Sequence, residues 1–185
     1  NGGGLAVGNC ATATPTPTVT PTPTATPTAA PGPIATVVVD AGVAATLTYT
    51  ATSGMQITVQ VPGDAVTQTT TLTMQEVGSQ PSAPVGFQLV GHAFTLDASV
   101  NSVLQPGFVF QAPVTVTLDY ADSDLVGLDE NTLMLSYFDT AANQWSSAGI
   151  TLIERDTVNN RLVVTISHLS LFAAIGAPPL PTATP

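Results

Sequence analysis

Short apolar runs separated by polar turns fill the chain between Ile34 and Ile175. The segment Met55–Val61 alternates strictly and places Met55, Ile57, Val59 and Val61 on one face. In Thr69–Val77, Leu72 and Met74 likewise share one side of the segment. Alternation with a period of two is typical of antiparallel β-strands that are buried on one face.

Further runs rich in β-branched and aromatic residues predict the remaining strands. They cover residues 34–39, 43–50, 87–96, 108–110, 114–118, 133–139, 144–146, 149–153 and 161–175. Only Asp122–Glu130 is a candidate for a helical turn, with Asp122 or Ser123 as its cap. The pattern therefore predicts an all-β fold, an antiparallel β-sandwich of about nine or ten strands.

Aromatic residues gather in the predicted strands between Leu133 and Ile175. Trp145 is the only tryptophan, and Tyr137, Phe138 and Phe172 lie in the same stretch. Aromatic side chains bury large areas, so we expect the centre of the core here, with Trp145 as its anchor.

Low-complexity sequence flanks the predicted sandwich and divides the chain into four parts. Residues 1–10 are glycine-rich, 11–33 form a Thr/Pro-rich stalk or linker, 34–176 carry the sandwich, and 177–185 form a Pro/Thr-rich tail. Proline fixes φ and lacks a donor, so the N-terminal stalk is predicted to be an extended polyproline II segment. At about 3.1 Å per residue, it could span roughly 70 Å.

Alternating threonine and proline is also typical of O-glycosylated stalks. The chain has no Asn-x-Ser/Thr acceptor, so any glycan is expected on threonines. The predicted sites are Thr14, Thr16, Thr18, Thr20, Thr22, Thr24, Thr26 and Thr28.

The net charge of the chain limits which classes of partner it can bind. Two Arg and no Lys stand against twelve Asp and Glu, for a net charge of −10. Such a surface repels phosphate backbones, which argues against nucleic acid as a partner. No apolar run is long enough to span a membrane. Cys10 is the only cysteine, so an intrachain disulfide is excluded; a stray thiol and an intermolecular link both remain open.

Two segments resemble a known β-sandwich family. Gly54–Val66 and Phe108–Leu118 are similar to the opening and the second signature of ZU-five-type domains. Tyr120–Ile175 resembles a module common in bacterial surface proteins. These resemblances imply a β-sandwich at a cell surface.

The ending Ser167-His-Leu-Ser-Leu-Phe-Ala173 also resembles the self-cleavage signature of GAIN domains. That resemblance implies Ser170 as nucleophile, His168 as base and a cut between Leu169 and Ser170. The alternative, which we favour, is that both residues are ordinary members of a terminal strand.

Acidic residues concentrate after the predicted strand 114–118. Asp119, Asp122, Asp124 and Asp129, with Glu130, could suggest calcium, although the spacing is not that of an EF-hand. A solvated, capped turn is the preferred interpretation, and His92 is expected to be an ordinary strand residue. No hydrolase triad or phosphate loop is visible, so neither an enzyme nor a cofactor is predicted.

These observations favour a non-enzymatic, secreted, cell-surface structural protein, a subunit of a filament, stalk or appendage that associates with itself into a homopolymer. The start at Asn1 fits a processed, secreted chain. Alternatives are an adhesin or binding module that recognises glycans, cell-wall components or another protein, and a self-cleaving domain. A segment near the N-terminus is expected to contact a neighbouring subunit, either by strand addition of the uncharged Ile34–Val39 or by packing of the stalk.

Overall fold

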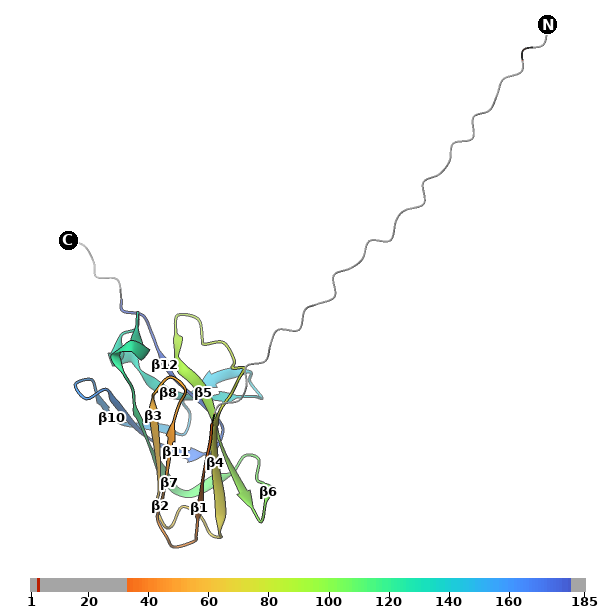
Figure 1. The fold of residues 1–185 in the computed structure, drawn as a ribbon, viewed down its shortest axis with the longest axis vertical. Coiled ribbons are helices and arrows are strands. Elements are labelled where there is room, and N and C mark those ends of the chain that lie inside the picture. Colours follow the sequence, from red (N-terminus) through yellow and green to blue (C-terminus); the bar gives the residue numbers. More distant parts are fainter. Residues whose placement is uncertain (1–2, 4–32, 181–185) are drawn as a thin grey trace.

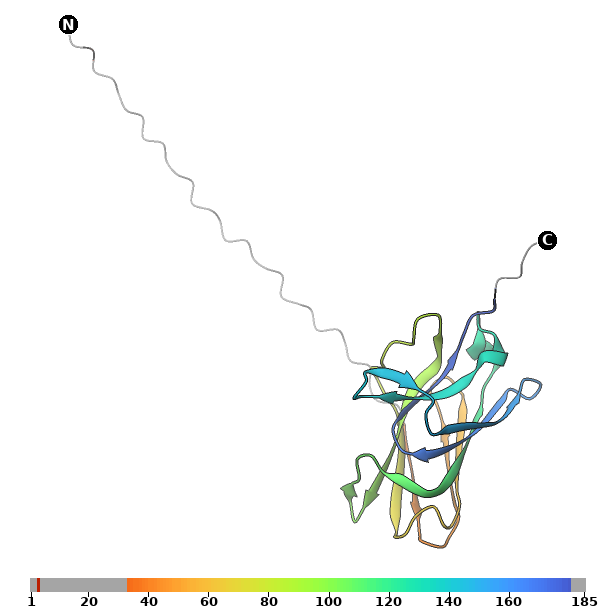
Figure 2. The ribbon, with the colours of Figure 1, turned by 180° about the vertical axis from the view of Figure 1, so that it is seen from behind.

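The computed structural model describes Gly3 and residues 33–180. Cys10, the Thr-Pro tract with its predicted glycosylation sites, and the end of the C-terminal tail lie outside the described residues. The described chain forms two antiparallel sheets packed face to face, as the alternation predicted (Figures 1 and 2). It is an all-β sandwich.

The first sheet has the strand order β1-β4-β5-β12-β8-β9, and the short β6 pairs with β5. The bounds of these strands are β1 Ile34–Val39, β4 Thr70–Glu76, β5 Gln88–Val100, β6 Val103–Leu104, β8 Met134–Asp139, β9 Gln144–Ser146 and β12 Leu171–Gly176.

The second sheet has the order β10-β11-β7-β3-β2. Its strands are β2 Ala45–Thr50, β3 Gln56–Val61, β7 Val109–Asp119, β10 Ile150–Asp156 and β11 Arg161–His168. The β10–β11 hairpin projects from the body of the sandwich in both views (Figures 1 and 2).

The inward faces of the two sheets meet in one main core, and the predicted alternation is confirmed there. Met55, Ile57, Val59 and Val61 are all buried, as are Leu72 and Met74 opposite them in the first sheet. Burial of such side chains is the main stabilising contribution to the sandwich.

The described part of the chain has twelve strands rather than the nine or ten predicted: β6 was not predicted, β5 and β10 run beyond the predicted 87–96 and 149–153, and two predicted runs are divided differently. Residues 108–110 and 114–118 belong to one strand, β7, that runs through Pro113. The pairing of β7 with β11 shifts register between Val109 and Val114, and its pairing with β3 ends at Thr115. Pro113 therefore occupies an irregular position where its missing N–H costs no ladder bond.

The predicted run 161–175 is two strands rather than one. β11 lies in the second sheet and β12 in the first, and the chain crosses between the sheets at Leu169 and Ser170. Backbone hydrogen bonds hold this crossing: Leu169 N–H donates to Phe108 O, and Leu96 N–H donates to Ser170 O, each at 3.0 Å.

The predicted helical turn is a pair of 3₁₀ turns, η1 (Asp122–Leu125) and η2 (Glu130–Thr132). The cap of η1 is Ala121, not Asp122 or Ser123. The Asp124 carboxylate accepts a hydrogen bond from Ala121 N–H at 2.9 Å and so supplies the capping interaction from inside the turn.

Strand directions place the two ends of the sandwich relative to each other. β1 is antiparallel to β4, β4 to β5 and β5 to β12, so β1 and β12 run in opposite directions. β1 therefore begins at the end of the sandwich at which β12 finishes (Figure 1). The opposite end carries the β1–β2 turn and the β5–β6 hairpin. No helix in the described part of the chain has the length and apolar character needed to cross a membrane.

Candidate functional site

A buried carboxylate near one end of the sandwich is the most unusual polar feature of the described chain. Glu76 ends β4, and its side chain is 4% exposed. It points inward because it has the same parity as Leu72 and Met74, whose side chains enter the core. Removing a carboxylate from water is costly unless hydrogen bonds or charges compensate it.

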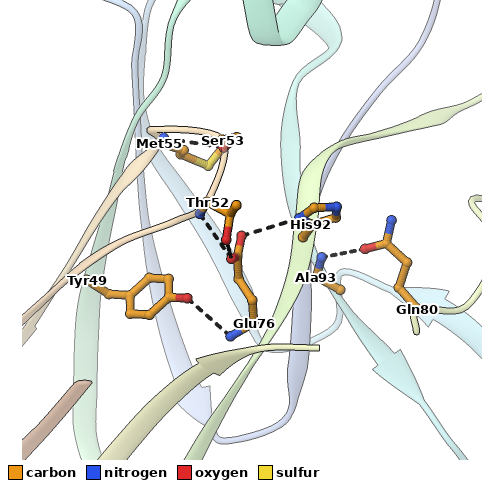
Figure 3. Close-up of polar contacts among 8 residues, drawn as sticks. All are labelled: Tyr49, Thr52, Ser53, Met55, Glu76, Gln80, His92 and Ala93. Atoms are coloured by element: carbon orange, nitrogen blue, oxygen red, sulfur yellow. Dashed lines mark hydrogen bonds and ion pairs between the residues drawn. The ribbon is translucent and has the colours of Figure 1, made fainter. Parts of the chain in front are cut away.

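Thr52, in the β2–β3 turn, supplies the principal compensation. Its backbone N–H donates to Glu76 Oε2 at 3.0 Å, and its hydroxyl donates to the same oxygen at 2.5 Å (Figure 3). Tyr49, on β2, accepts a hydrogen bond from Glu76 N–H at 3.4 Å through its phenol oxygen. These bonds join the second sheet, which holds Tyr49, to the first, which holds Glu76.

The other carboxylate oxygen faces a histidine. Glu76 Oε1 is buried and accepts no hydrogen bond, but His92 Nδ1 on β5 lies 3.5 Å away. The His92 side chain is 55% exposed, so this ion pair forms between a solvent-facing imidazole and an interior carboxylate when His92 is protonated (Figure 3).

The backbone beside His92 is in a left-handed conformation. Gly91 has φ of +65°, which favours glycine, and a Cβ there would make only ordinary contacts with Ser53 and Met55 of the β2–β3 turn. Ala93 N–H donates to Gln80 Oε1 at 2.6 Å, which anchors the β4–β5 loop to the same strand.

This cluster joins the two sheets through hydrogen bonds. Burial raises the pKa of the Tyr49 phenol, which keeps it protonated. The described residues hold no group of three or more His, Cys, Asp or Glu side chains placed to bind a metal ion. Glu76 was not among the predicted site residues, although its parity with Leu72 and Met74 was a usable signal.

The predicted pair His168 and Ser170 lies where the chain crosses between the sheets. The Ser170 hydroxyl donates to Phe138 O at 3.5 Å, and no hydrogen bond connects it to His168. His168 packs edge-on against Tyr137 at a centroid distance of 4.5 Å. Burial lowers the pKa of His168 and favours its neutral form. The two residues therefore lie close together in the chain, but the structure does not join them as a hydrogen-bonded base and nucleophile.

Each predicted acidic ligand has a partner within the protein. Asp119 pairs with Arg161 at 2.7 Å, and Asp122 accepts from Asn160 Nδ2 at the same distance. Asp124 caps η1, and Asp129 accepts from the backbone and side-chain nitrogens of Asn131. These carboxylates stabilise turns and a strand pair instead of converging on one point.

Glu130 accepts a hydrogen bond from the Tyr120 hydroxyl at 2.8 Å. Burial, followed by this hydrogen bond, raises the pKa of Tyr120. Glu130, the last residue of the acidic stretch, is therefore also hydrogen-bonded within the protein.

Trp145 is not the centre of the main core. It lies on β9 at the edge of the first sheet, is half-buried, and packs against a second, smaller cluster of Ala93, Ala173 and Ile175. Along β12, Phe172 and Ala174 join the main core, whereas Ala173 and Ile175 face the other way. The prediction failed because residue size shows how much area can be buried but not on which face of a sheet.

Neither a protein-family model nor any of the curated proteins compared with the chain matches it.

Proposed function

We propose that this chain is a non-enzymatic structural domain of an extracellular surface, a subunit that associates with other copies through an open sheet edge while Thr-Pro tracts space the sandwiches. The observation that carries the proposal is the chemistry of β1. The resemblance of the chain to ZU-five-type domains and the location of the protein outside the cell stay predictions.

β1 is an edge strand without the usual protection. It pairs with β4 over its whole length, from Ile34 opposite Gln75 to Val39 opposite Thr70, and with no second strand among the described residues. It contains no charged residue, and Val38 is 57% exposed. Soluble β-proteins commonly block such edges with charges, proline or bulges.

β10, one of the two edge strands of the second sheet, differs in this respect. β10 carries Glu154, Arg155 and Asp156, and its pairing with β11 shifts register between Leu152 and Glu154. Charges and an irregular ladder both oppose pairing with another chain. β2, the other edge of the second sheet, is as long as β1 and is also uncharged. Of these two edges, β1 directly follows the Thr-Pro tract in the chain, so it is the one that we take to extend the sheet into a second copy, by antiparallel pairing across a two-fold axis.

A lysine on β1 tests the proposal. Thr36 is exposed in the middle of the strand, so Thr36→Lys introduces a charge at the proposed contact without entering the core. Sedimentation velocity over a range of concentrations is expected to show association for the natural chain and a monomer for the variant.

Gln60→Lys is the matched control, because it adds the same charge at an exposed position on β3, which has neighbours on both sides. This control is expected to associate like the natural chain. A natural chain that remains monomeric at millimolar concentration, or a Thr36→Lys variant that associates normally, contradicts the proposal.

A second candidate function, adhesion, is favoured by the end of the sandwich opposite to the one at which β12 leaves. Val43 in the β1–β2 turn and Val103 and Leu104 on β6 are exposed there, between 57% and 62%. Exposed apolar residues at a loop-bearing end suit the capture of another molecule. Binding to immobilised mucin and peptidoglycan that is lost in Leu104→Asp would support this candidate over self-association.

A further inference from the structure

Two hollows flank the indole ring of Trp145. The first, of about 170 Å³, is lined mainly by Pro84, Phe87, Met134 and Ile175. The second, of about 310 Å³, is lined by Ser82, Val85, Phe138, Asn143 and Gln144, and it shares Pro84 and Trp145 with the first. The indole and Pro84 therefore form a ridge between two neighbouring depressions.

The ring that forms this ridge is held in place. Its Nε1–H donates to Ser82 O at 2.9 Å, which fastens it to the β4–β5 loop. Phe138 packs against it edge to face, with centroids 5.4 Å apart. A rigid, partly exposed aromatic surface costs little entropy when it binds a partner.

The chemistry of the two hollows is unusual for this protein. No Asp, Glu, Arg or His lines either of them, although the chain carries a net charge of −10. Their surface is formed by aromatic, proline and aliphatic groups with a few hydroxyls and amides. Water in such a site has few hydrogen-bond partners, so its displacement by an apolar group is favourable.

We propose that these hollows bind the Thr-Pro tract of a second copy of this chain, residues 14–28. Aromatic-lined grooves take up polyproline II segments because such segments are preformed and lose little entropy on binding. The tract has no charge, which matches the uncharged hollows, and it repeats Pro-Thr-Pro at 15–17 and 21–23.

The spacing of the tract fits a ridge with a hollow on each side. In polyproline II, residues two positions apart are separated by about 6 Å along the axis and point to different sides. Two such prolines can straddle the indole, one in each hollow. The exposed amides of Asn143 and Gln144 lie beside the second hollow and can donate to backbone carbonyls, which polyproline II leaves unbonded.

This inference rests on the proposed self-association, and it names the segment that one copy presents to the next. It uses a different surface from β1, so the two contacts can be separated by experiment. Sugars are the other chemistry that a partly exposed tryptophan suggests, but the hollows offer no carboxylate to hold sugar hydroxyls.

Trp145 fluorescence is a direct readout, since it is the only tryptophan and residues 14–28 contain no aromatic side chain. The receptor is the full chain with Pro15, Pro17, Pro21, Pro23 and Pro27 replaced by alanine, so that its own tract does not compete. A synthetic peptide of residues 14–28 is expected to shift the emission saturably. The same peptide with alanine at its five prolines should bind at least tenfold more weakly.

Substitutions locate the site. Phe87 is 39% exposed in a loop, so Phe87→Ser removes part of the first hollow with little effect on folding and should weaken the peptide at least tenfold. Gln144→Ala tests the amide donor at the second hollow. Val126→Ser, at an exposed apolar position that lines neither hollow, is the control and should leave binding unchanged.

Three results would overturn the inference: no fluorescence shift at millimolar peptide, equal binding of the alanine peptide, or a shift produced by chito-oligosaccharides and not by the peptide. None of them bears on pairing through β1, which sedimentation of Thr36→Lys measures separately. A Thr36→Lys variant that no longer assembles but still binds the peptide would support the inference that the hollows bind the tract. It would also identify β1 as the stronger of the two contacts.

Discussion

Thr52 donates both its backbone and its side-chain hydrogen bond to a single carboxylate oxygen of Glu76, 24 residues further along the chain. The two residues belong to different sheets: Thr52 follows β2, and Glu76 ends β4. A charged group therefore fastens one end of a sandwich whose interior is otherwise almost wholly apolar.

Glu76→Ala should destabilise the sandwich, because it leaves the Thr52 donors without their acceptor and opens a cavity. The expected loss is about 1–3 kcal/mol from the unpaired donors, before any cavity cost. Urea unfolding followed by circular dichroism measures it. Glu154→Ala, at an exposed position on β10, is the control and should cost less than about 0.5 kcal/mol. Equal effects of the two substitutions would show that the Thr52–Glu76 contact contributes nothing.

His168 should make the fold less stable in mild acid. Burial lowers its pKa below the ordinary value of 6.5, so the unfolded chain takes up this proton at a higher pH than the folded chain does. Its contribution is complete above the unfolded pKa and is lost as the pH falls from there through the folded pKa.

The melting temperature between pH 7.5 and 5.5 measures this effect. His92→Gln serves as the background, because His92 and His168 are the only histidines. Adding His168→Gln should flatten the profile over this range. An unchanged slope in the double variant would assign the acid sensitivity to carboxylates.

Phe172 should contribute more to stability than Trp145. Phe172 is 1% exposed and stacks on Phe94 with centroids 5.9 Å apart, whereas Trp145 is half-buried at a sheet edge. Phe172→Ala is expected to cost roughly 3–5 kcal/mol, and Trp145→Ala less. Denaturant titration followed by circular dichroism decides between them. The reverse order would place the tryptophan at the energetic centre after all.

Removal of divalent cations should leave the melting temperature unchanged, because Asp119, Asp122, Asp124 and Asp129 already accept hydrogen bonds or ion pairs from the protein. Differential scanning calorimetry with EDTA and with calcium tests this. A metal at a hundred times its dissociation constant adds about 2.7 kcal/mol, a shift of roughly 5–10 °C for a domain of this size. A shift of that order would identify a calcium site in the acidic stretch.

The Thr-Pro tract should carry O-linked sugars when the protein is isolated from its natural source. The intact mass is then expected to exceed the 18.7 kDa of the bare chain by multiples of a sugar residue. Digestion should place the extra mass within Thr14–Thr28. A mass equal to that of the bare chain would rule out the modification.

Several features of this protein follow from the sequence alone. The alternation in Met55–Val61 and the matching parity of Leu72 and Met74 specify which side chains enter the core, because successive residues of a strand point to opposite faces. β1 was predicted with its observed bounds, Ile34–Val39. The same parity indicates that the Glu76 side chain points inward, but Glu76 was not among the predicted core residues because its side chain is a carboxylate.

Other features were decided only by the tertiary structure. The run 161–175 reads as one apolar segment, but the chain changes sheet at Leu169 and Ser170, and strand alternation carries no record of which sheet a strand joins. Trp145 packs on the outer face of the first sheet because the β4–β5 loop crosses to meet it at Ser82. Thr52 reaches Glu76 because the second sheet packs on the first. The Thr52–Glu76 contact, across 24 residues, is set by how the two sheets stack, and the Ser82–Trp145 contact, across 63 residues, by where the β4–β5 loop lies on the first sheet. Local patterns encode neither arrangement.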